Sequence, residues 1–473
     1  MNVLAPFLDN AARWSARRAI VAPGAGAIGF GALAERSARL AASWRGQGIG
    51  PGDRVLVAMP LGIALYAAIA ALWRLGAVVV FPEPALGLAG LRRAAGLARP
   101  KAFLGAGWMR ALGFLPELWR VPIRLDAAGG AAGGEFVHPA EADHPALISF
   151  TSGSTGLPKA ILRSHGFLAA QNACVAELLR SDDPGQTDLV AFPVFVIANL
   201  GLGICSVLPD WKPGRPDRAR AEGIARLVAA HGITRALAPP ALCEILAAGP
   251  PMRGLRSVLT GGGPVFPDVM EKLADRLATR DIVAVYGSTE AEPIAHQALD
   301  AIGAADWTRM REGGGLLAGR PIAGIRLELI DEEIAVTGDH VVKGYLDPAD
   351  DAETKLRRDG AIWHRTGDAG RLDAEGRLWL LGRRSAKAGR LYPFMVETAA
   401  RGWPGVRQAA LIPASDPPTL AIAGDAARRP VWAACAAAFG DLRVVPVAAI
   451  PLDRRHRSKV DYAALRRLAP VPR

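Results

Sequence analysis

The chain has 473 residues and a formal net charge of +11, and 51% of its residues are hydrophobic. This length allows two or three domains with a large core, and the composition excludes a disordered chain. Eight of the 56 basic residues are lysines and no nucleic-acid motif accompanies them, so the charge favours anionic small molecules over nucleic acid as partners.

The cysteines and the most apolar run of the chain indicate its environment. The four cysteines lie far apart without metal-binding spacing, and residues 1–10 lack the basic and apolar regions of a secretory signal. A cytoplasmic, reducing location is therefore expected. Residues 61–80 are nearly all apolar, but Arg74 interrupts them and Gly76 and Pro82 punctuate their end, which predicts a buried helix and strand and no membrane segment.

The first 145 residues alternate between helical and strand patterns. Apolar positions recur at helical spacing over residues 30–44, and a Gly-Pro-Gly-Asp turn leads into a strand at 54–58. A helix over 63–75, a strand over 78–81 and a helix over about 86–97 follow. This order predicts an α/β fold in which helices cover a sheet.

A loop rich in hydroxyl groups and glycine follows a strand predicted at 146–150. It consists of Thr151, Ser152, Gly153, Ser154, Thr155 and Gly156, and Lys159 comes three residues later. Backbone N–H groups and hydroxyls in such a loop bind anions, glycine lets the backbone approach closely, and the lysine adds a positive charge for a phosphate. The Leu-Pro-Lys sequence excludes a Walker A loop, and the flanking apolar strands argue against a flexible linker.

This loop resembles the phosphate-binding signature of the adenylate-forming superfamily, which includes acyl-CoA synthetases, adenylation domains of peptide synthetases and luciferases. One departure is Ala160, where the family usually has glycine. The resemblance implies a large multi-sheet N-terminal domain over residues 1–382, which binds ATP and the acyl group. It also implies a small, mobile α+β domain over residues 386–473, which carries the catalytic lysine.

An apolar run at residues 192–200 follows a helix predicted at about 167–179 and a strand at 189–192. Many acyl-activating relatives carry a histidine near Phe195, whereas this chain has none there. The run either lines an acyl pocket, with Phe195 and Asn199 in its wall, or belongs to the ordinary core. The sequence leaves both alternatives open.

Two predicted strands in the middle of the chain end in glycine and polar residues. A strand over 255–260 leads into Gly261, Gly262 and Gly263, and in the resembled family this turn passes along the adenine and acyl pocket. A strand over 282–286 ends in the superfamily's second signature, which here is Tyr286, Gly287, Ser288, Thr289 and Glu290. The resemblance implies that Tyr286 stacks on adenine, Thr289 donates to a phosphate and Glu290 holds Mg²⁺.

Three further matches lie toward the carboxyl end. Asp368 corresponds to the aspartate that accepts hydrogen bonds from both ribose hydroxyls, and Arg383 to the ribose-contacting arginine. Ser385 falls at the hinge position. Lys459 matches the lysine that contacts the carboxylate and the α-phosphate, and we expect it to reach the site only when the small domain rotates.

Together these matches imply an enzyme that activates a small-molecule carboxylate with ATP and Mg²⁺ as an acyl-adenylate. Lys459, Glu290 and Thr289 are then the catalytic residues, which position the reactants and neutralise charge. The alternative from another class is a nucleotide-binding relic without turnover. The presence of all the charged motif residues argues against that alternative.

The second step is either closure to a β-lactone or transfer to CoA or a carrier thiol. The loop from 382 to 393 is shorter than in CoA ligases, and short runs at 192–195, 377–379 and 453–456 resemble β-lactone synthetases of bacterial olefin pathways. An internal β-hydroxyl needs no CoA site and gains a large effective concentration. We place lactone closure slightly ahead and leave CoA use, the identity of the acid and the oligomeric state open.

Overall fold

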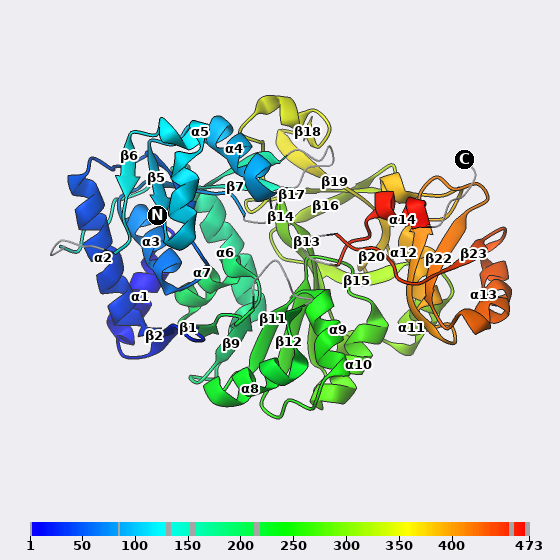
Figure 1. The fold of residues 1–473 in the computed structure, drawn as a ribbon. Helices are drawn as coiled ribbons and strands as arrows, with labels where there is room; N and C mark the ends of the chain where they lie inside the picture. Colours follow the sequence, from blue (N-terminus) through cyan, green and yellow to red (C-terminus); the bar gives the residue numbers. More distant parts are fainter. Residues whose placement is uncertain are drawn as a thin grey trace.

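The computed structural model describes residues 2–83, 86–128, 134–151, 158–211, 218–453 and 458–468. Within these ranges the strands form three sheets, of fourteen, six and three strands, with helices packed on their faces (Figure 1). The α/β class predicted from the sequence is confirmed, including a small C-terminal part with its own sheet. In the same ranges no helix is both long and apolar enough to cross a bilayer.

The six-stranded sheet leads into the hydroxyl-rich loop. Its strands run in the order β6 (Ile123–Leu125), β5 (Ala102–Gly105), β3 (Arg54–Ala58), β4 (Val78–Phe81), β7 (Pro145–Thr151) and β8 (Lys159–Ser164). β7 and β8 pair antiparallel, and the other neighbours are parallel. The helices of this part are α2 (Phe30–Gly46), α3 (Ile63–Arg74), α4 (Gly87–Ala98), α5 (Pro116–Trp119) and α6 (His165–Leu179). β3 and β4 are mostly buried, which explains their continuous apolar sequences.

The fourteen-stranded sheet of the described residues spans the large part of the molecule. Its order is β16 (Arg326–Ile330), β17 (Glu333–Thr337), β19 (Ala361–Leu372), β20 (Leu378–Arg383), β15 (Leu316–Pro321), β14 (Ala291–Ala298), β13 (Asp281–Ser288), β12 (Ser257–Gly261), β11 (Arg235–Ala238), β9 (Thr187–Val190), β10 (Cys205–Val207), β1 (Arg18–Ala22) and β2 (Gly26–Gly29), with β18 (Lys355–Arg358) paired to β19. Strands β9, β11, β12 and β13 are parallel neighbours, so their carboxyl ends meet at one edge, where ligands bind in such sheets.

Helices from several parts of the chain cover this sheet. They are α1 (Ala5–Arg13), α7 (Pro193–Leu202), α8 (Ala221–His231), α9 (Pro240–Ala248), α10 (Pro267–Leu277) and α11 (Ala304–Arg311). α7 contains the apolar run to which the sequence assigned no element. Pro193 is the first residue of this helix, a position at which the backbone N–H makes no intrahelical hydrogen bond, so proline is tolerated there. Gly203 ends the helix with φ of +72°.

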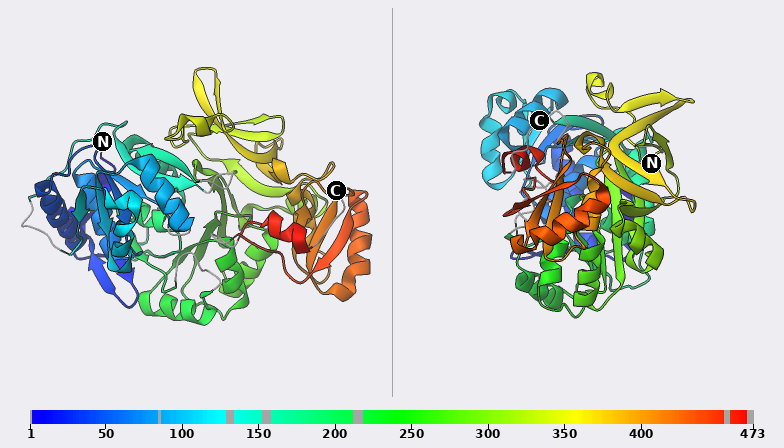
Figure 2. Two further views of the ribbon diagram at one scale, coloured as in Figure 1. Left: turned by 45° about the horizontal axis from the view of Figure 1, so that its top comes forward. Right: turned by 90° about the vertical axis from the view of Figure 1, so that its right-hand side faces the viewer.

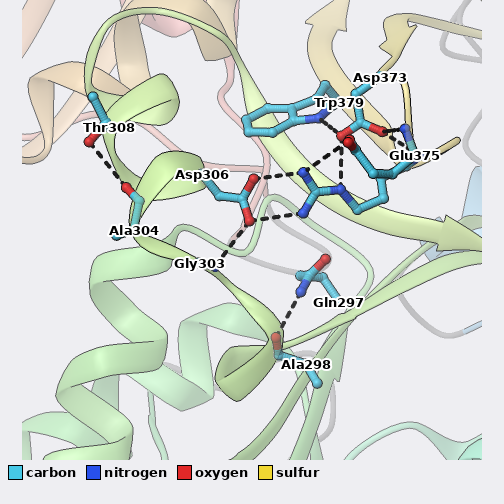
Figure 3. A network of polar contacts seen from close by, with 10 residues as sticks. Gln297, Ala298, Gly303, Ala304, Asp306, Thr308, Asp373, Glu375 and Trp379 are labelled. Atoms are coloured by element: carbon cyan, nitrogen blue, oxygen red, sulfur yellow. Dashed lines mark hydrogen bonds and ion pairs between the residues drawn. The ribbon is translucent and has the colours of Figure 1, made fainter.

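A polar network fixes the hairpin of β19 and β20 on α11 (Figure 3). The Nη1 and Nη2 atoms of Arg377 donate to Oδ2 and Oδ1 of Asp306 at 2.9 and 2.8 Å. Its Nε donates to Oδ2 of Asp373 at 2.8 Å, and Nε1 of Trp379 donates to the same oxygen at 2.8 Å. A guanidinium bonded to carboxylates on both sides gives a fixed geometry, so this network holds the strands β19 and β20 in place.

The C-terminal part has its own sheet and core. The sheet consists of β21 (Val406–Ile412), β22 (Thr419–Gly424) and β23 (Arg443–Val447), and its helices are α12 (Pro393–Ala400), α13 (Arg429–Ala436) and α14 (Tyr462–Leu468). Trp432, Leu420 and Val396 are fully buried in this core. The sheet lies at the end of the molecule opposite α1 and α2 (Figures 1 and 2). We propose that the chain from residue 386 onward moves as one unit.

Arg401, which follows α12, makes two ion pairs between this C-terminal part and the large part. Its Nε lies 2.7 Å from Oδ1 of Asp268, and its Nη2 lies 3.3 Å from Oε1 of Glu244. The guanidinium also stacks on Phe266, 4.6 Å from the ring centroid. Burial raises the pKa of Asp268, but the Arg401 charge outweighs burial and leaves that pKa below its usual value.

Replacing Arg401 with methionine should loosen this contact. We expect trypsin to cut within residues 383–390 about fivefold faster, because a partly buried ion pair of this kind contributes about 1 kcal/mol. Fragments identified by mass spectrometry measure the rate, and Arg407→Met, an exposed arginine on β21, is the control. Equal cleavage of both variants and the wild type would show that Arg401 does not restrain the C-terminal part.

Candidate active site

The two ends of the hydroxyl-rich loop lie opposite each other. Thr151 ends β7, Lys159 begins β8, and the two residues pair in register. Both are buried. The carbonyl oxygen of Pro158 accepts a 2.9 Å hydrogen bond from Nε of Arg93 on α4, which anchors the lysine end of the loop. The other predicted phosphate-binding residues lie outside the described residues: Ser152, Gly153, Ser154, Thr155 and Gly156.

Lys159 belongs to a group of ionisable side chains around Tyr345, which we call the Tyr345 cluster: Lys159, Tyr345, Lys355, His364 and Glu290. The Nζ atoms of Lys159 and Lys355 lie 5.1 and 5.3 Å from the Tyr345 ring centroid. Nζ of Lys355 donates to the carbonyl oxygen of Val342 and lies 3.2 Å from Nδ1 of His364. Two ammonium groups at one ring form a site for a polyanion.

Burial sets the protonation of the Tyr345 cluster. It lowers the pKa of Lys355 to about 8, although the charge of Glu290 opposes this shift. Burial and the Lys355 charge together lower the pKa of His364 to about 4. At neutral pH His364 is therefore uncharged, and its Nδ1 can accept a hydrogen bond from the Lys355 ammonium.

Glu290 lies in the turn between β13 and β14, where the resemblance places a metal ligand. Its Oε1 accepts a 2.9 Å hydrogen bond from the Tyr345 hydroxyl. Burial raises the pKa of Glu290, but the positive groups around it and this hydrogen bond outweigh burial, so its pKa lies below the usual value. Among the described residues no three acidic, histidine or cysteine side chains form a metal cage. A single carboxylate beside a phosphate site fits Mg²⁺, which takes its remaining ligands from phosphates and water.

Arg163 on β8 holds this turn, and the sequence analysis did not identify it. It is buried, its Nη2 donates to the carbonyl oxygen of Thr289 at 2.5 Å, and its Nη1 donates to Oγ of Ser149. It therefore fixes the backbone between Thr289 and Glu290. The sequence signal was an arginine that directly follows the apolar residues 160–162 within one strand.

Tyr286, Asp368 and Arg383 come together from β13, β19 and β20. The Tyr286 hydroxyl donates to Oδ2 of Asp368 at 2.9 Å, and Nε of Arg383 lies 3.2 Å from Oδ1. Burial and the Asp368 charge raise the pKa of Tyr286 well above its usual value, so it remains a donor. The arrangement brings a carboxylate, which can accept hydrogen bonds from ribose hydroxyls, next to an aromatic ring, which can stack on a base, as a nucleoside site requires.

Gly287 and Ser288 end β13 beside this nucleoside site. A Cβ on Gly287 would lie 3.0 Å from the carbonyl oxygen of Ala291, so the turn has little room for a side chain. Oγ of Ser288 is buried and has no hydrogen-bond partner among the residues that the structure describes. An unsatisfied buried hydroxyl at this position is consistent with a bound polar ligand.

The turn after β12 brings the C-terminal segment to the site. Gly262 has φ of +78°, and a Cβ on Gly263 would lie 2.4 Å from Cβ of Ser458. Oδ1 of Asp453 accepts hydrogen bonds from the backbone N–H groups of Ser458 and Lys459 at 3.1 and 2.9 Å. This loop therefore places Lys459 beside the glycine turn.

The expectation that Lys459 reaches the site only after a domain rotation stays a prediction, although this structure already places the Lys459 segment beside the glycine turn. Ser458 already packs against Gly263, and the charge of Lys459 acts on Glu292 of β14. The residues 454–456, which the sequence analysis associated with lactone closure, lie outside the described residues.

An apolar cavity of about 440 Å³, including its open mouth, adjoins this turn. Phe192, which directly precedes α7, and Phe195 of α7 line it with ring centroids 5.8 Å apart, and Gly261 lines it as well. The remaining lining residues are Val175, Leu178, Leu179, Leu237, Leu259, Thr260, Val285, Glu292 and Pro293. Glycine is required at 261 because a Cβ there would lie 2.6 Å from the carbonyl oxygen of Val285.

Asn199, predicted for the acyl pocket, is not in the wall of this cavity. It is fully buried, and its Nδ2 donates to Oδ2 of Asp188 at 3.0 Å and to Oγ of Ser206 at 3.1 Å. Arg235 pairs with the same aspartate at 2.8 Å. One helical turn separates Phe195 from Asn199. Phe195 faces the cavity and Val196 lies in the core, and the use of this cavity for an acyl group stays a prediction.

Ser385 lies in the short turn Arg384–Ala386 after β20 and is exposed. Its neighbour Arg384 donates from Nη1 to Oε2 of Glu333 at 2.7 Å, and the Tyr392 hydroxyl donates to Glu332 at 3.0 Å. These contacts tie the connection between β20 and α12 to the β16–β17 turn. The hinge role of Ser385 stays a prediction.

Comparison with known proteins agrees with this geometry. The family model described as AMP-binding enzyme matches residues 7–346. An olefin β-lactone synthetase of Xanthomonas campestris is 30% identical, covering 92% of this chain and 89% of the relative. A feruloyl-CoA synthase of Amycolatopsis is 31% identical over 85% of each chain.

Solved structures show the same fold. The amide bond synthetase McbA from Marinactinospora thermotolerans superposes with a TM-score of 0.80 at 22% identity, covering 98% of this chain and 99% of McbA. The O-succinylbenzoate coenzyme A synthetase from Bacillus subtilis, in complex with AMP, superposes with a TM-score of 0.76 at 20% identity, covering 99% of this chain and 98% of the synthetase.

Proposed function

We propose, from the premise that this chain belongs to the AMP-binding enzyme family, that it activates a β-hydroxy carboxylate with ATP and then closes the product to a β-lactone. The chain is an adenylate-forming ligase, and its family uses ATP. One observation carries the proposal: the apolar cavity adjoins the glycine turn against which the Lys459 segment packs. An acyl tail in that cavity places its carboxylate beside Lys459.

In the first step a carboxylate oxygen of the substrate attacks the α-phosphorus of ATP, and pyrophosphate leaves. Asp368, Tyr286 and Arg383 hold the nucleoside, and Lys459 neutralises negative charge at the carboxylate and the α-phosphate. Lys159 and Lys355 of the Tyr345 cluster attract the leaving pyrophosphate. These are effects of positioning and charge, which need no covalent enzyme intermediate.

Glu290 and Thr289 support the same step. Glu290 would hold Mg²⁺, which neutralises phosphate charge when bound. Arg163 bonds the carbonyl oxygen of Thr289 and so fixes the turn on which both residues lie. The hydroxyl of Thr289 is then available to donate to a phosphate.

In the second step the substrate's own β-hydroxyl oxygen attacks the acyl carbon. The acyl–phosphate bond breaks, AMP leaves, and the hydroxyl proton passes to solvent or to the departing AMP. Relatives named as olefin β-lactone synthetases, one of them matching 92% of this chain, support this route. The 31% identity with a feruloyl-CoA synthase supports the second candidate, an acyl-CoA ligase, in which a thiol replaces the hydroxyl.

The decisive assay offers the enzyme ATP, Mg²⁺ and long-chain β-hydroxy acids, with and without CoA. We expect a product lighter than the acid by one water, formed without CoA and detected by mass spectrometry. The matched acid without the hydroxyl should give pyrophosphate and acyl-adenylate but no lactone. A product that forms only with CoA, with the mass of an acyl-CoA, would replace the lactone proposal by the ligase.

A further inference from the structure

Glu292 places a carboxyl group in a cavity wall that is otherwise mostly apolar. It is the second residue of β14, and the cavity that it lines is shared with Phe192, Leu259 and Val285. A charged group in such a wall lowers the stability of the fold unless an ion pair or hydrogen bond compensates it, so its presence there suggests a functional role. Among the described residues its carboxylate makes no ion pair and no hydrogen bond. The backbone carbonyl oxygen of Glu292 accepts a 3.2 Å hydrogen bond from Nε2 of Gln171.

Glu292 lies at the reacting end of the cavity. Burial raises the pKa of Glu292, and the charges of Arg163 and Lys459 oppose this shift, so both cations lie near its carboxyl group. Gly261 lines the same cavity, and two residues later Gly263 packs against Ser458. The carboxyl group of Glu292 therefore lies near the first carbons of a bound acid and not near its tail.

We propose that the Glu292 carboxylate accepts a hydrogen bond from the β-hydroxyl of the substrate and so selects β-hydroxy acids over unsubstituted ones. This inference rests on the proposed function and names the residue that sets its substrate class. The β-hydroxyl is two carbons from the carboxylate, so a group beside the reacting end can reach it. A hydrogen bond to a charged acceptor is stronger than one between neutral groups.

The charges around Glu292 favour a hydroxyl over an amine. Arg163 and Lys459 already supply positive charge near this carboxylate, so a cationic β-amino group would add like charge to a buried site. A neutral hydroxyl donates a hydrogen bond without changing the net charge. Holding the hydroxyl beside the acyl carbon also raises its effective concentration for lactone closure.

The test measures preference between paired acids. Matched β-hydroxy and unsubstituted acids, from short to long chains, are compared by kcat/KM for pyrophosphate release in the wild type, Glu292→Leu and Glu292→Gln. We expect the wild type to prefer the hydroxy acid by about tenfold and Glu292→Leu to prefer neither. Glu292→Gln, which keeps an acceptor oxygen, should fall between them. Glu177→Gln, an exposed carboxylate on α6, should keep the wild-type ratio.

The preference ratio separates selection from a structural role. If Glu292 only balances the charge of Arg163, both acids should lose rate equally in Glu292→Leu and the ratio should not move, which would overturn the inference. A wild type that activates both acids of each pair equally, or that prefers β-amino acids, would also overturn it while leaving adenylation intact. A wild type that activates no acid would overturn the proposed function itself.

Discussion

Replacing Lys459 with alanine should lower the rate of pyrophosphate release by about 10²–10³-fold, while ATP still binds. The structure places the Lys459 segment beside the glycine turn, where the Asp453 carboxylate accepts hydrogen bonds from the backbone N–H groups of Ser458 and Lys459. A fixed positive charge at the carboxylate and α-phosphate acts mainly where charge develops in the transition state, and removing one such group costs about this much. Binding of ATP should survive because Asp368, Tyr286 and Lys159 come from other elements.

Carboxylate-dependent exchange of pyrophosphate into ATP measures the rate, and calorimetry measures ATP binding. Lys101→Ala is the matched control, because this lysine is exposed and pairs with Asp53, far along the chain from the site motifs. If Lys459→Ala exchanged pyrophosphate at the wild-type rate, Lys459 would have no role in the first step. If it lost ATP binding equally, its role would be in nucleotide binding and not in the transition state.

The local elements could be predicted from the sequence because their signals are local. The strand at 54–58 and the strand at 78–81 have the predicted bounds, since continuous apolar residues between turn signals leave little choice. Strand ends were less certain: the strand predicted at 282–286 extends over Asp281–Ser288 because pairing with β14 continues to Ser288. Hydrogen bonding with a neighbour sets such ends, and the sequence does not show the neighbour.

Individual site residues could be predicted where they belong to a short sequence motif, but the contacts between residues from different motifs could not. Tyr286 and Asp368 were identified from short signatures, but their mutual hydrogen bond joins strands 82 residues apart. Lys355 belongs to no signature, and it becomes part of the site, beside His364 of the signature that ends in Asp368, because β18 pairs with β19. Asn199 lies in the core and Phe195 faces the cavity, because the direction in which each residue projects from α7 decides which of them reach the cavity, and the apolar run alone does not show that direction.

Lys355 should contribute to ATP binding although no sequence motif contains it. Changing it to methionine should raise the KM for ATP by about ten- to a hundredfold, the value of a hydrogen bond to a charged group. Its ammonium lies at the Tyr345 ring with that of Lys159, and His364 and Val342 hold it there. Lys343→Met, an exposed lysine on the same segment as Tyr345, should leave the KM unchanged.

The pH dependence of ATP use tests the charge of Lys355 directly. Burial lowers the pKa of Lys355 to about 8 against the opposing charges of Glu290 and Asp351, while Lys159 adds to the lowering. The ammonium is therefore present below pH 8 and lost above it, and the wild-type kcat/KM for ATP should fall between pH 7 and 9. Lys355→Arg remains charged throughout this range, so its profile should lack this fall. The same fall in both enzymes would assign the titration to another group, and an unchanged KM in Lys355→Met would remove Lys355 from the pyrophosphate site.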